Sequence, residues 1–295
     1  MGVRFVTNHL TQNISQTTTV LDAYCVFGNP IAHSKSPAIH ALFAQQTTQN
    51  MRYEARLAPL DGFATSVREF VQQGGRGANV TVPFKLDAFE LCDHLSQRAQ
   101  SGGAVNTLRF ENGRIEGDNT DGAGLVTDIV KNAGFAIKGK RVLLIGAGGA
   151  ARGALLPLLQ EEPRSLFIAN RTVEKAEELV DMARQWKITE VVSEAGSFDQ
   201  IQGQFDLVIN ASSASLHGES LALPEALFAK QSLAYDMMYG AELTPFLKFA
   251  QSAGAQVRDG LGMLIEQAAE AFFVWRGVRP KTELVFAQLR QQMQR

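Results

Sequence analysis

The feature that most constrains the fold is a glycine-rich turn near the middle of the 295-residue chain. The run Gly146-Ala147-Gly148-Gly149-Ala150-Ala151 fits the pattern G-x-G-x-x-G/A and follows the apolar segment 142–145. The missing side chains let the backbone approach a pyrophosphate, which the N-terminus of the next helix then binds. Because a helical stretch over 150–159 follows, the turn predicts dinucleotide binding. A glycine turn used only for helix–strand packing is the alternative.

The chain around and after this turn alternates short apolar strands with helical stretches. Strands are expected over 142–145, 166–169, 206–209 and 233–236. Such strands, separated by helices, are typical of a doubly wound parallel sheet that is covered on both faces. After Gly260 the pattern changes, and two helices are expected, over 261–274 and 281–293.

The residues after the strand 166–169 indicate which dinucleotide would bind. An NAD site usually has an acidic residue here, which accepts a hydrogen bond from the ribose 2′-hydroxyl. This chain instead has Asn170-Arg171-Thr172, with Lys175 one turn later. Arg171 can pair with a 2′-phosphate and stack on adenine, and Thr172 can donate its hydroxyl. The sequence therefore favours NADP, although Thr172 could serve only as a helix N-cap beside a solvated arginine.

The first half of the chain also alternates strands and helices, and it is predicted to be α/β with a mixed sheet. One helix should begin with Ser36 as N-cap and Pro37 in its first turn, and another should run from Asp61 to Gly74. Asn112-Gly113 predicts a hairpin at an edge of the sheet. The strands are expected over 23–27, 53–57, 78–82, 105–110 and from the hairpin toward Asp118.

Polar side chains follow two of these strands. Lys85 comes after the strand 78–82, and Asp121 follows the returning strand of the hairpin. If the two loops converge, the pair can supply or relay the proton that hydride transfer to a carbonyl requires. Taken alone, Lys85 could equally be a solvated surface charge. Ser34 and Ser36 precede a predicted helix and suit a carboxylate ligand, unless Ser36 is only the cap.

Composition excludes several classes of protein. With 45% hydrophobic and 20% charged residues, the chain is an ordinary globular protein, and no apolar run approaches the roughly 18 residues of a membrane span. The net charge of −2 argues against a broad nucleic-acid-binding surface. Cys25 and Cys92 are expected to be reduced thiols of a cytoplasmic protein. His33 and His40 have no partners at metal-ligand spacing and are interpreted as structural, so no metal site is predicted.

Taken together, these segments resemble the shikimate dehydrogenase family, in its NADP-dependent biosynthetic branch. The resemblance runs in the right order over about residues 22–295. The matching segments are 28–37 (GNPIAHSKSP), 79–85 (NVTVPFK), 104–107 (AVNT), 119–121 (NTD), the glycine turn from Gly146, 170–172 (NRT), 235–239 (YDMMY) and 260–264 (GLGML) ahead of Gln267.

The resemblance implies roles for the matching positions. Lys85 and Asp121 would be the catalytic pair, and the glycine turn, Asn170, Arg171, Thr172 and Lys175 would bind the cofactor. Met237 and Gly260 would face the nicotinamide. The substrate carboxylate and hydroxyls would be bound by Ser34, Ser36, Thr81, Asn106, Tyr239 and Gln267. Lys175 stands where the family often has arginine. A lysine ammonium lacks the planar guanidinium that would form paired hydrogen bonds with the 2′-phosphate.

The resemblance also implies the architecture and the reaction. Residues 22–122 plus 259–295 would form a discontinuous substrate domain around a Rossmann-type NADP domain, 123–258, while residues 1–21 are expected to be a disordered extension. The implied reaction is the reversible, NADPH-dependent reduction of 3-dehydroshikimate to shikimate in aromatic amino-acid biosynthesis. The protein would be a cytoplasmic monomer or homodimer that binds neither nucleic acid nor membrane.

Three alternatives remain at this point. A relative that oxidises quinate as well as shikimate, with NAD or NADP, is the nearest, and Asn170-Arg171-Thr172 argues against it. A catalytically inactive NADP-binding regulator on the same fold is opposed by the presence of both Lys85 and Asp121. A two-domain dehydrogenase acting on a folate is opposed by Ser34 and Ser36, which suit a small carboxylate better.

Overall fold

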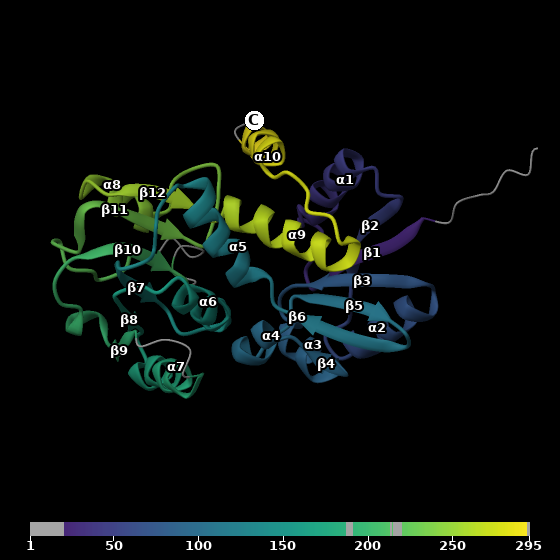
Figure 1. The fold of residues 1–295 in the computed structure, drawn as a ribbon, viewed down its shortest axis with the longest axis horizontal. Coiled ribbons are helices and arrows are strands. Elements are labelled where there is room, and N and C mark those ends of the chain that lie inside the picture. Colours follow the sequence, from purple (N-terminus) through teal and green to yellow (C-terminus); the bar gives the residue numbers. More distant parts are fainter. Residues whose placement is uncertain (1–20, 187–190, 213, 215–219, 294–295) are drawn as a thin grey trace, which may run out of the picture.

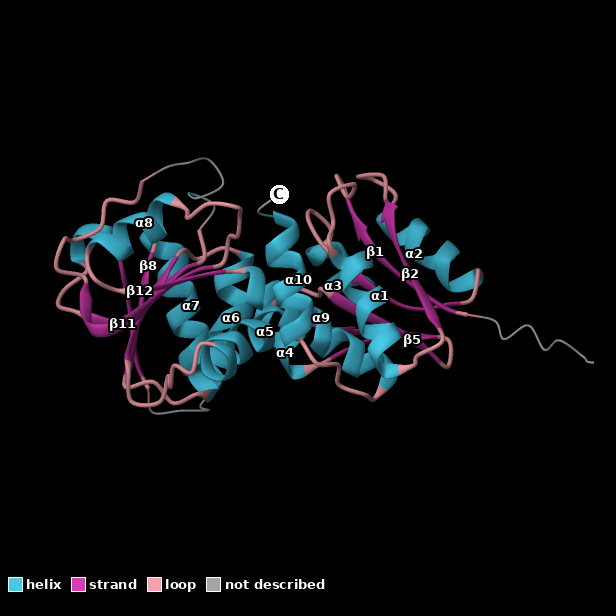
Figure 2. Ribbon diagram, turned by 90° about the horizontal axis from the view of Figure 1, so that it is seen from above, coloured by secondary structure: helices cyan, strands magenta, loops and turns pink. Residues whose placement is uncertain are grey.

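The chain builds two six-stranded β-sheets, one on each side of the segment 119–140. The computed structural model describes residues 21–186, 191–212, 214 and 220–293. The two sheets lie at opposite ends of the molecule, with helices α5 (Asp121–Thr127) and α9 (Leu261–Arg276) between them (Figure 1). Figure 2 shows the same arrangement from above. The predicted α/β architecture is confirmed.

The first sheet is mixed. It runs in the order β2-β1-β3-β5-β6-β4, with β1 parallel to both neighbours and β5 antiparallel to both of its own. Phenylalanines from its strands and helices, among them Phe27, Phe63 and Phe70, pack in one core. The strands are β1 Asp22–Gly28, β2 Met51–Leu57, β3 Gly75–Val80, β4 His94–Leu95, β5 Thr107–Glu111 and β6 Arg114–Asp118. The helices are α1 Ser36–Thr47, α2 Phe63–Gln72, α3 Lys85–Leu91 and α4 Gln97–Gly102.

The second sheet is wholly parallel, in the order β12-β11-β10-β7-β8-β9. The strand order reverses between β7 and β10, which is where doubly wound sheets bind their ligands. The central strands are buried on both faces, as their continuous apolar sequences require. The strands are β7 Arg141–Ile145, β8 Ser165–Ala169, β9 Val192–Gly196, β10 Phe205–Asn210, β11 Phe228–Asp236 and β12 Gln256–Asp259. The helices are α6 Gly149–Gln160, α7 Val173–Trp186 and α8 Pro245–Ser252, with a 3₁₀ turn at Phe198–Gln200.

The two crossings between the sheets pack directly on each other. Helix α5 continues into a π-helical turn, Asp128–Asn132, and α9 follows β12 at once. At Gly124 a Cβ atom would lie 2.6 Å from the backbone nitrogen of Gln267, so only glycine permits this close helix contact. Helix α9 then packs with α1 and with the last helix, α10 (Glu283–Met293), through residues such as Phe43 and Phe272.

Several details differ from the sequence-based expectations. Ser36 is the first residue of α1, and Lys35 occupies the N-cap position. The hairpin β5-β6 is not at the edge, because the two-residue strand β4 pairs with β6 outside it. Strand β3 begins three residues before the predicted strand and ends at Val80. Strand β2 is an edge strand whose Leu57 is exposed.

Two further expectations can be compared with the described part of the chain. Cys25 and Cys92 are both free thiols, as predicted. None of the helices in the described ranges is long and apolar enough to span a membrane. The extension expected over residues 1–21 lies, apart from Leu21, outside the described residues.

Candidate active site

Lys85 and Asp121 form a direct ion pair. The Lys85 Nζ atom lies 2.6 Å from Asp121 Oδ2, and the two side chains are 33% and 16% exposed. Lys85 opens α3 just after β3, and Asp121 opens α5 just after β6. Strand β5 lies between β3 and β6 and is antiparallel to both, so β3 and β6 run in the same direction. Their carboxyl ends therefore lie on the same side of the mixed sheet. The pair remains accessible to a small molecule, as a proton-transferring group must be.

The pair lies in a pocket of about 490 Å³ between the two sheets. All six residues predicted to bind substrate line it, together with the predicted catalytic pair. The Asn106 amide nitrogen donates to Asp121 Oδ1 at 2.8 Å and lies 3.4 Å from Gln267 Oε1. The pocket residues predicted from the sequence are Ser34, Ser36, Thr81, Lys85, Asn106, Asp121, Met237, Tyr239, Gly260 and Gln267.

One end of the pocket has the character of an anion site. Ser34 and Ser36 lie at the N-terminus of α1, a twelve-residue helix, and Ser34 Oγ accepts a hydrogen bond from the Ser36 backbone nitrogen at 3.3 Å. His33 and Lys35 also line this end. A helix N-terminus with two hydroxyls and a lysine stabilises negative charge, so a carboxylate fits here.

The loop after β11 forms another wall of the pocket. Its Met238 backbone nitrogen donates to the buried carboxylate of Asp236 at 3.0 Å, and its Gly240 carbonyl accepts from Arg290 of α10 at 3.3 Å. Burial, and the nearby Asp259 carboxylate, raise the pKa of Tyr239. The Tyr239 hydroxyl therefore keeps its proton at neutral pH and can donate a hydrogen bond.

A second pocket, of about 590 Å³, lies over the glycine turn. Gly146 has a φ of +103°, and a Cβ there would lie 3.1 Å from the Ser212 backbone nitrogen. At Gly148 and Gly149 a Cβ would meet nothing within 4 Å, so the turn faces open space. The N-terminus of α6 has no side-chain cap. Its free N–H groups and the bare backbone therefore fit a pyrophosphate.

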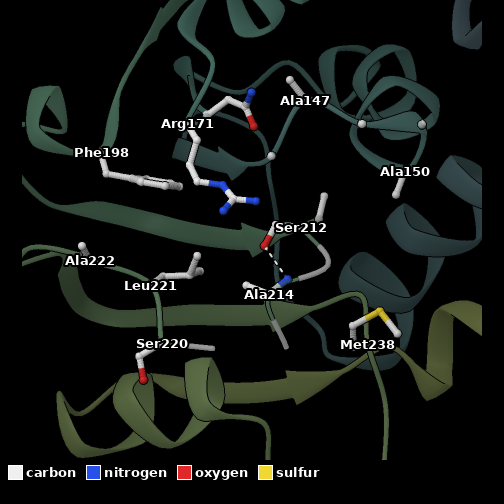
Figure 3. A pocket seen from close by; sticks show the side chains of 15 residues that line it. Ala147, Ala150, Arg171, Phe198, Ser212, Ala214, Ser220, Leu221, Ala222 and Met238 are labelled. Atoms are coloured by element: carbon white, nitrogen blue, oxygen red, sulfur yellow. Dashed lines mark hydrogen bonds between the residues drawn. The ribbon is translucent and has the colours of Figure 1, made fainter. Parts of the chain in front are cut away.

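The far side of this pocket fits an adenosine 2′-phosphate. Arg171 and Phe198 point into the same space from the ends of β8 and β9 (Figure 3). Asn170, at the end of β8, replaces the carboxylate of an NAD site, and its amide donates to the Thr172 carbonyl at 2.8 Å. Thr172 and Lys175 are exposed beside Arg171 and do not line the pocket.

Several lining residues were not predicted from the sequence. They are Phe198, Ala211, Ser212, Ala214, Ser220, Leu221, Ala222 and Met238. Met238 lines both pockets, so the pocket over the glycine turn and the pocket that holds Lys85 are neighbours at this residue. Met237 and Gly260, expected to face a nicotinamide, lie on the substrate side of this junction. A Cβ at Gly260 would lie 2.1 Å from the Met237 carbonyl oxygen, which explains why glycine stands there.

Three family models match the chain in order. The shikimate dehydrogenase substrate-binding domain matches residues 26–108, shikimate/quinate 5-dehydrogenase matches 128–219, and the shikimate 5′-dehydrogenase C-terminal domain matches 260–290. These ranges include Lys85 and the glycine turn, whereas Asp121 and the segment 237–239 lie between them.

Individual proteins agree with these models. The shikimate dehydrogenase (NADP(+)) of Janthinobacterium sp. (strain Marseille) is 59% identical over 276 residues, which are 94% of this chain and 100% of that protein. An Ael1 enzyme from Pseudomonas putida has a TM-score of 0.86 at 49% identity, covering 91% of this chain and 98% of that one. Shikimate 5-dehydrogenase from Thermus thermophilus, in complex with NADP(H) and shikimate, has a TM-score of 0.81 at 31% identity, covering 92% and 99%.

Proposed function

The chain belongs to the shikimate dehydrogenase family, and on that premise we propose which of its residues carry out the family's reaction. The activity is that of an NADP-dependent shikimate dehydrogenase, the reversible reduction of 3-dehydroshikimate to shikimate. One observation carries the assignment of the site: the Lys85–Asp121 pair lies in the substrate pocket, which meets the nucleotide pocket at Met238.

Lys85 handles the proton of the reaction. NADPH, when bound, supplies the hydride that the carbonyl carbon receives. The carbonyl oxygen then becomes an alkoxide, and the Lys85 ammonium donates a proton to it. Asp121, 2.6 Å away, holds the ammonium toward the reacting oxygen and stabilises its charge before transfer. In the oxidation of shikimate the same groups act in reverse, and Lys85 accepts the proton of the hydroxyl.

The remaining pocket residues orient the substrate. Ser34 and Ser36 hold its carboxylate at the N-terminus of α1. Thr81, Asn106, Tyr239 and Gln267 bind its hydroxyls, since each presents a donor or an acceptor to the same cavity. Holding the ring at both ends places its carbonyl next to Lys85, which lowers the entropic cost of reaching the reactive geometry.

The nucleotide pocket suits NADP over NAD. Gly146, Ala147, Gly148, Gly149 and Ala150 would hold the pyrophosphate against α6. Arg171 would form paired hydrogen bonds with the 2′-phosphate, helped by Asn170 and Thr172. Lys175, exposed one turn into α7, would add positive charge. Met237 and Gly260 would contact the nicotinamide at the junction of the pockets.

Initial-rate measurements at 340 nm test this proposal. The four combinations of shikimate or quinate with NADP or NAD are compared in one assay, and shikimate with NADP is expected to be the fastest. Equal or faster oxidation of quinate would identify the quinate-oxidising relative. The absence of any absorbance change would identify an inactive NADP-binding regulator.

The Lys85→Ala variant tests the role of the pair in the same assay. It is expected to lose most of the turnover, because the ammonium that Asp121 holds for protonating the alkoxide is gone, while shikimate still binds in a calorimetric titration. The control is Lys35→Ala, at the carboxylate end of the same pocket. It is expected to raise KM for shikimate and to change kcat little. Near-normal kcat in Lys85→Ala would overturn the assignment.

We also propose the domain boundaries, the place of residues 1–21, and the compartment and oligomeric state of the protein. The domain boundaries are 22–122 plus 259–295 for the substrate domain and 123–258 for the NADP domain, which the two separate sheets support. Residues 1–21 would be an extension with no role in the fold. The protein would act in the cytoplasm as a monomer or homodimer, and the two free thiols, Cys25 and Cys92, are compatible with a reducing compartment.

A further inference from the structure

Thr120 lies directly behind the catalytic pair and is completely buried. It occupies the N-cap position of α5, but its side chain makes no capping hydrogen bond to the helix. The hydroxyl instead lies 3.0 Å from Asn106 Nδ2 and 3.1 Å from Asn106 Oδ1. Helix capping therefore does not explain why a threonine stands here.

The carbonyl end of the Asn106 amide is held by hydrogen-bond donors. Asn106 Oδ1 accepts from the Thr120 backbone nitrogen at 2.9 Å and from the Thr107 hydroxyl at 2.9 Å. The reverse orientation of the amide would place its NH₂ against the Thr120 N–H and its oxygen against the Asp121 carboxylate. Both contacts would be repulsive, so the amide nitrogen must face Asp121.

The Asn106 amide nitrogen carries two hydrogens, and the Thr120 hydroxyl determines which acceptor each of them meets. Thr120 Oγ1 accepts one of them, whether its own proton points to Asn106 Oδ1 or to Thr107 Oγ1 at 3.3 Å. The second hydrogen then points to Asp121 Oδ1 at 2.8 Å. Asp121 Oδ2 is left to accept from Lys85. One carboxylate oxygen is thus committed to Asn106 and the other to the lysine.

The cluster is anchored on its far side. Asn79 Nδ2 donates to Thr107 Oγ1 at 3.1 Å, and Tyr53 donates to Asn79 Oδ1 at 2.7 Å. Asn79, Asn106 and Thr107 are all buried. Because the polar atoms of this cluster satisfy one another away from water, their geometry is rigid.

We propose that Thr120 is a positioning residue for catalysis: through the Asn106 amide it fixes the Asp121 carboxylate so that one oxygen faces Lys85. This rests on the proposed function of the Lys85–Asp121 pair. Without the hydroxyl, that amide hydrogen keeps only the longer contact to Gln267 Oε1, at 3.4 Å, so the amide can shift toward Gln267 and away from Asp121. The carboxylate then rotates, and Lys85 spends less time aimed at the reacting oxygen.

Two pairs of variants isolate the hydroxyl. Thr120→Val keeps the shape and removes the hydroxyl, whereas Thr120→Ser removes a methyl group and keeps the hydroxyl. Thr120→Val is expected to lower kcat about tenfold and to raise KM for shikimate less, while Thr120→Ser stays within about threefold of the parent. If Thr120→Val does not fold, Thr120→Ala compared with Thr120→Ser asks the same question. Thr127→Val, at the other end of α5, is the matched control and is expected to leave kcat unchanged.

Calorimetric titration with NADP, whose pocket lies away from Thr120, separates positioning from general damage. The proposal requires that NADP affinity be unchanged in every Thr120 variant. Parental kcat in Thr120→Val, equal loss of kcat in the valine and serine variants, or weakened NADP binding in any of them would each overturn it. Failure of the Lys85–Asp121 assignment is recognised separately, because Lys85→Ala would then retain its turnover.

Discussion

At the scale of single residues, His40 shows how burial constrains a titratable group. It is fully buried, and neither ring nitrogen has a hydrogen-bond partner among the described residues. The ring stacks on Tyr53 at 4.2 Å and meets Phe43 edge-on. Burial lowers the pKa of His40 to about 3, because a charged imidazolium would lose its hydration there. The interpretation of His40 as structural agrees with this aromatic environment.

Because His40 is buried in its neutral form, we expect the protein to lose stability in weak acid. The folded protein keeps the ring neutral down to about pH 3, whereas the unfolded chain binds a proton below its ordinary pKa of about 6.5. The free energy of unfolding therefore falls as the pH drops below about 6.5. Between pH 7 and pH 5 the loss from this residue is about 2 kcal/mol.

Urea unfolding of His40→Phe at both pH values tests this. Phenylalanine can stack in the same place without a titratable group, so the variant should lose about 2 kcal/mol less than the parent between pH 7 and pH 5. Equal losses in the two proteins would mean that His40 is protonated in the folded state. The comparison depends only on the difference between the two pH values, so a constant packing cost of phenylalanine does not affect it.

At the scale of elements, helix α10 anchors a wall of the pocket that holds Lys85 and Asp121. Arg290 donates to both carboxylate oxygens of Asp259, at 2.8 and 2.5 Å, and to the Gly240 carbonyl. Val285 and Leu289 on the same helix pack against α1 and α9. The helix thus ties the loop that carries Tyr239 to the core beside the substrate pocket.

Removing the hydrogen bonds of Arg290 to Asp259 and Gly240 should weaken substrate binding more than turnover. Arg290→Gln is expected to raise KM for shikimate roughly fivefold, which corresponds to about 1 kcal/mol, and to leave kcat within twofold. Arg290→Lys should recover only part of the loss, because lysine cannot bind both Asp259 oxygens with a planar fork. Arg279→Gln is the control, since Arg279 pairs with Glu270 on α9, away from the loop. An unchanged KM in Arg290→Gln would show that the loop holds its position without α10.

The elements that could be predicted from the sequence are those with strong local patterns. The strand before the glycine turn, the Asn112-Gly113 hairpin and both C-terminal helices follow from periodicity and turn residues. The strands β9 (VSEAG) and β12 (QVRD) were missed, because short polar edge strands have no apolar pattern and exist by pairing with a neighbour. Strand β4 has only two residues, and its pairing outside β6 moved the hairpin away from the edge.

The residues of the candidate site also fall into those that could be predicted from the sequence and those that could not. Lys85 and Asp121 could be predicted, because chemistry in α/β folds gathers where strands end. Phe198 and Met238 could not be, since each is an ordinary apolar residue until the fold brings it to a pocket. The hydrogen bonds that join Thr120 to Asn106 link residues on separate segments, and no local spacing indicates them.

At the scale of the whole molecule, a buried carboxylate joins the two chain crossings. Asp128, fully buried at the end of α5, accepts from Arg258 Nε and Nη2 at 2.7 and 2.6 Å. It also accepts from the Tyr235 hydroxyl and the Asn132 amide, both at 2.9 Å. Tyr235 and Arg258 lie on β11 and β12, so the parallel sheet holds the outgoing crossing next to the returning one. A Cβ at Gly262 would lie 2.0 Å from Asp128 Oδ1, which shows how closely α9 is seated there.

Breaking this ion pair should therefore destabilise the protein strongly. In Arg258→Met the Asp128 carboxylate stays buried with only neutral donors, and removal of one partner of a buried pair costs about 3 kcal/mol. The double variant Asp128→Asn with Arg258→Met leaves no buried charge and should regain part of that loss. Arg184→Met is the control, because the exposed pair of Arg184 with Asp181 is worth less than about 1 kcal/mol. Urea unfolding of the four proteins measures these differences. If the single and double variants were equally unstable, packing between the crossings would hold them together, and the charge on Asp128 would not matter.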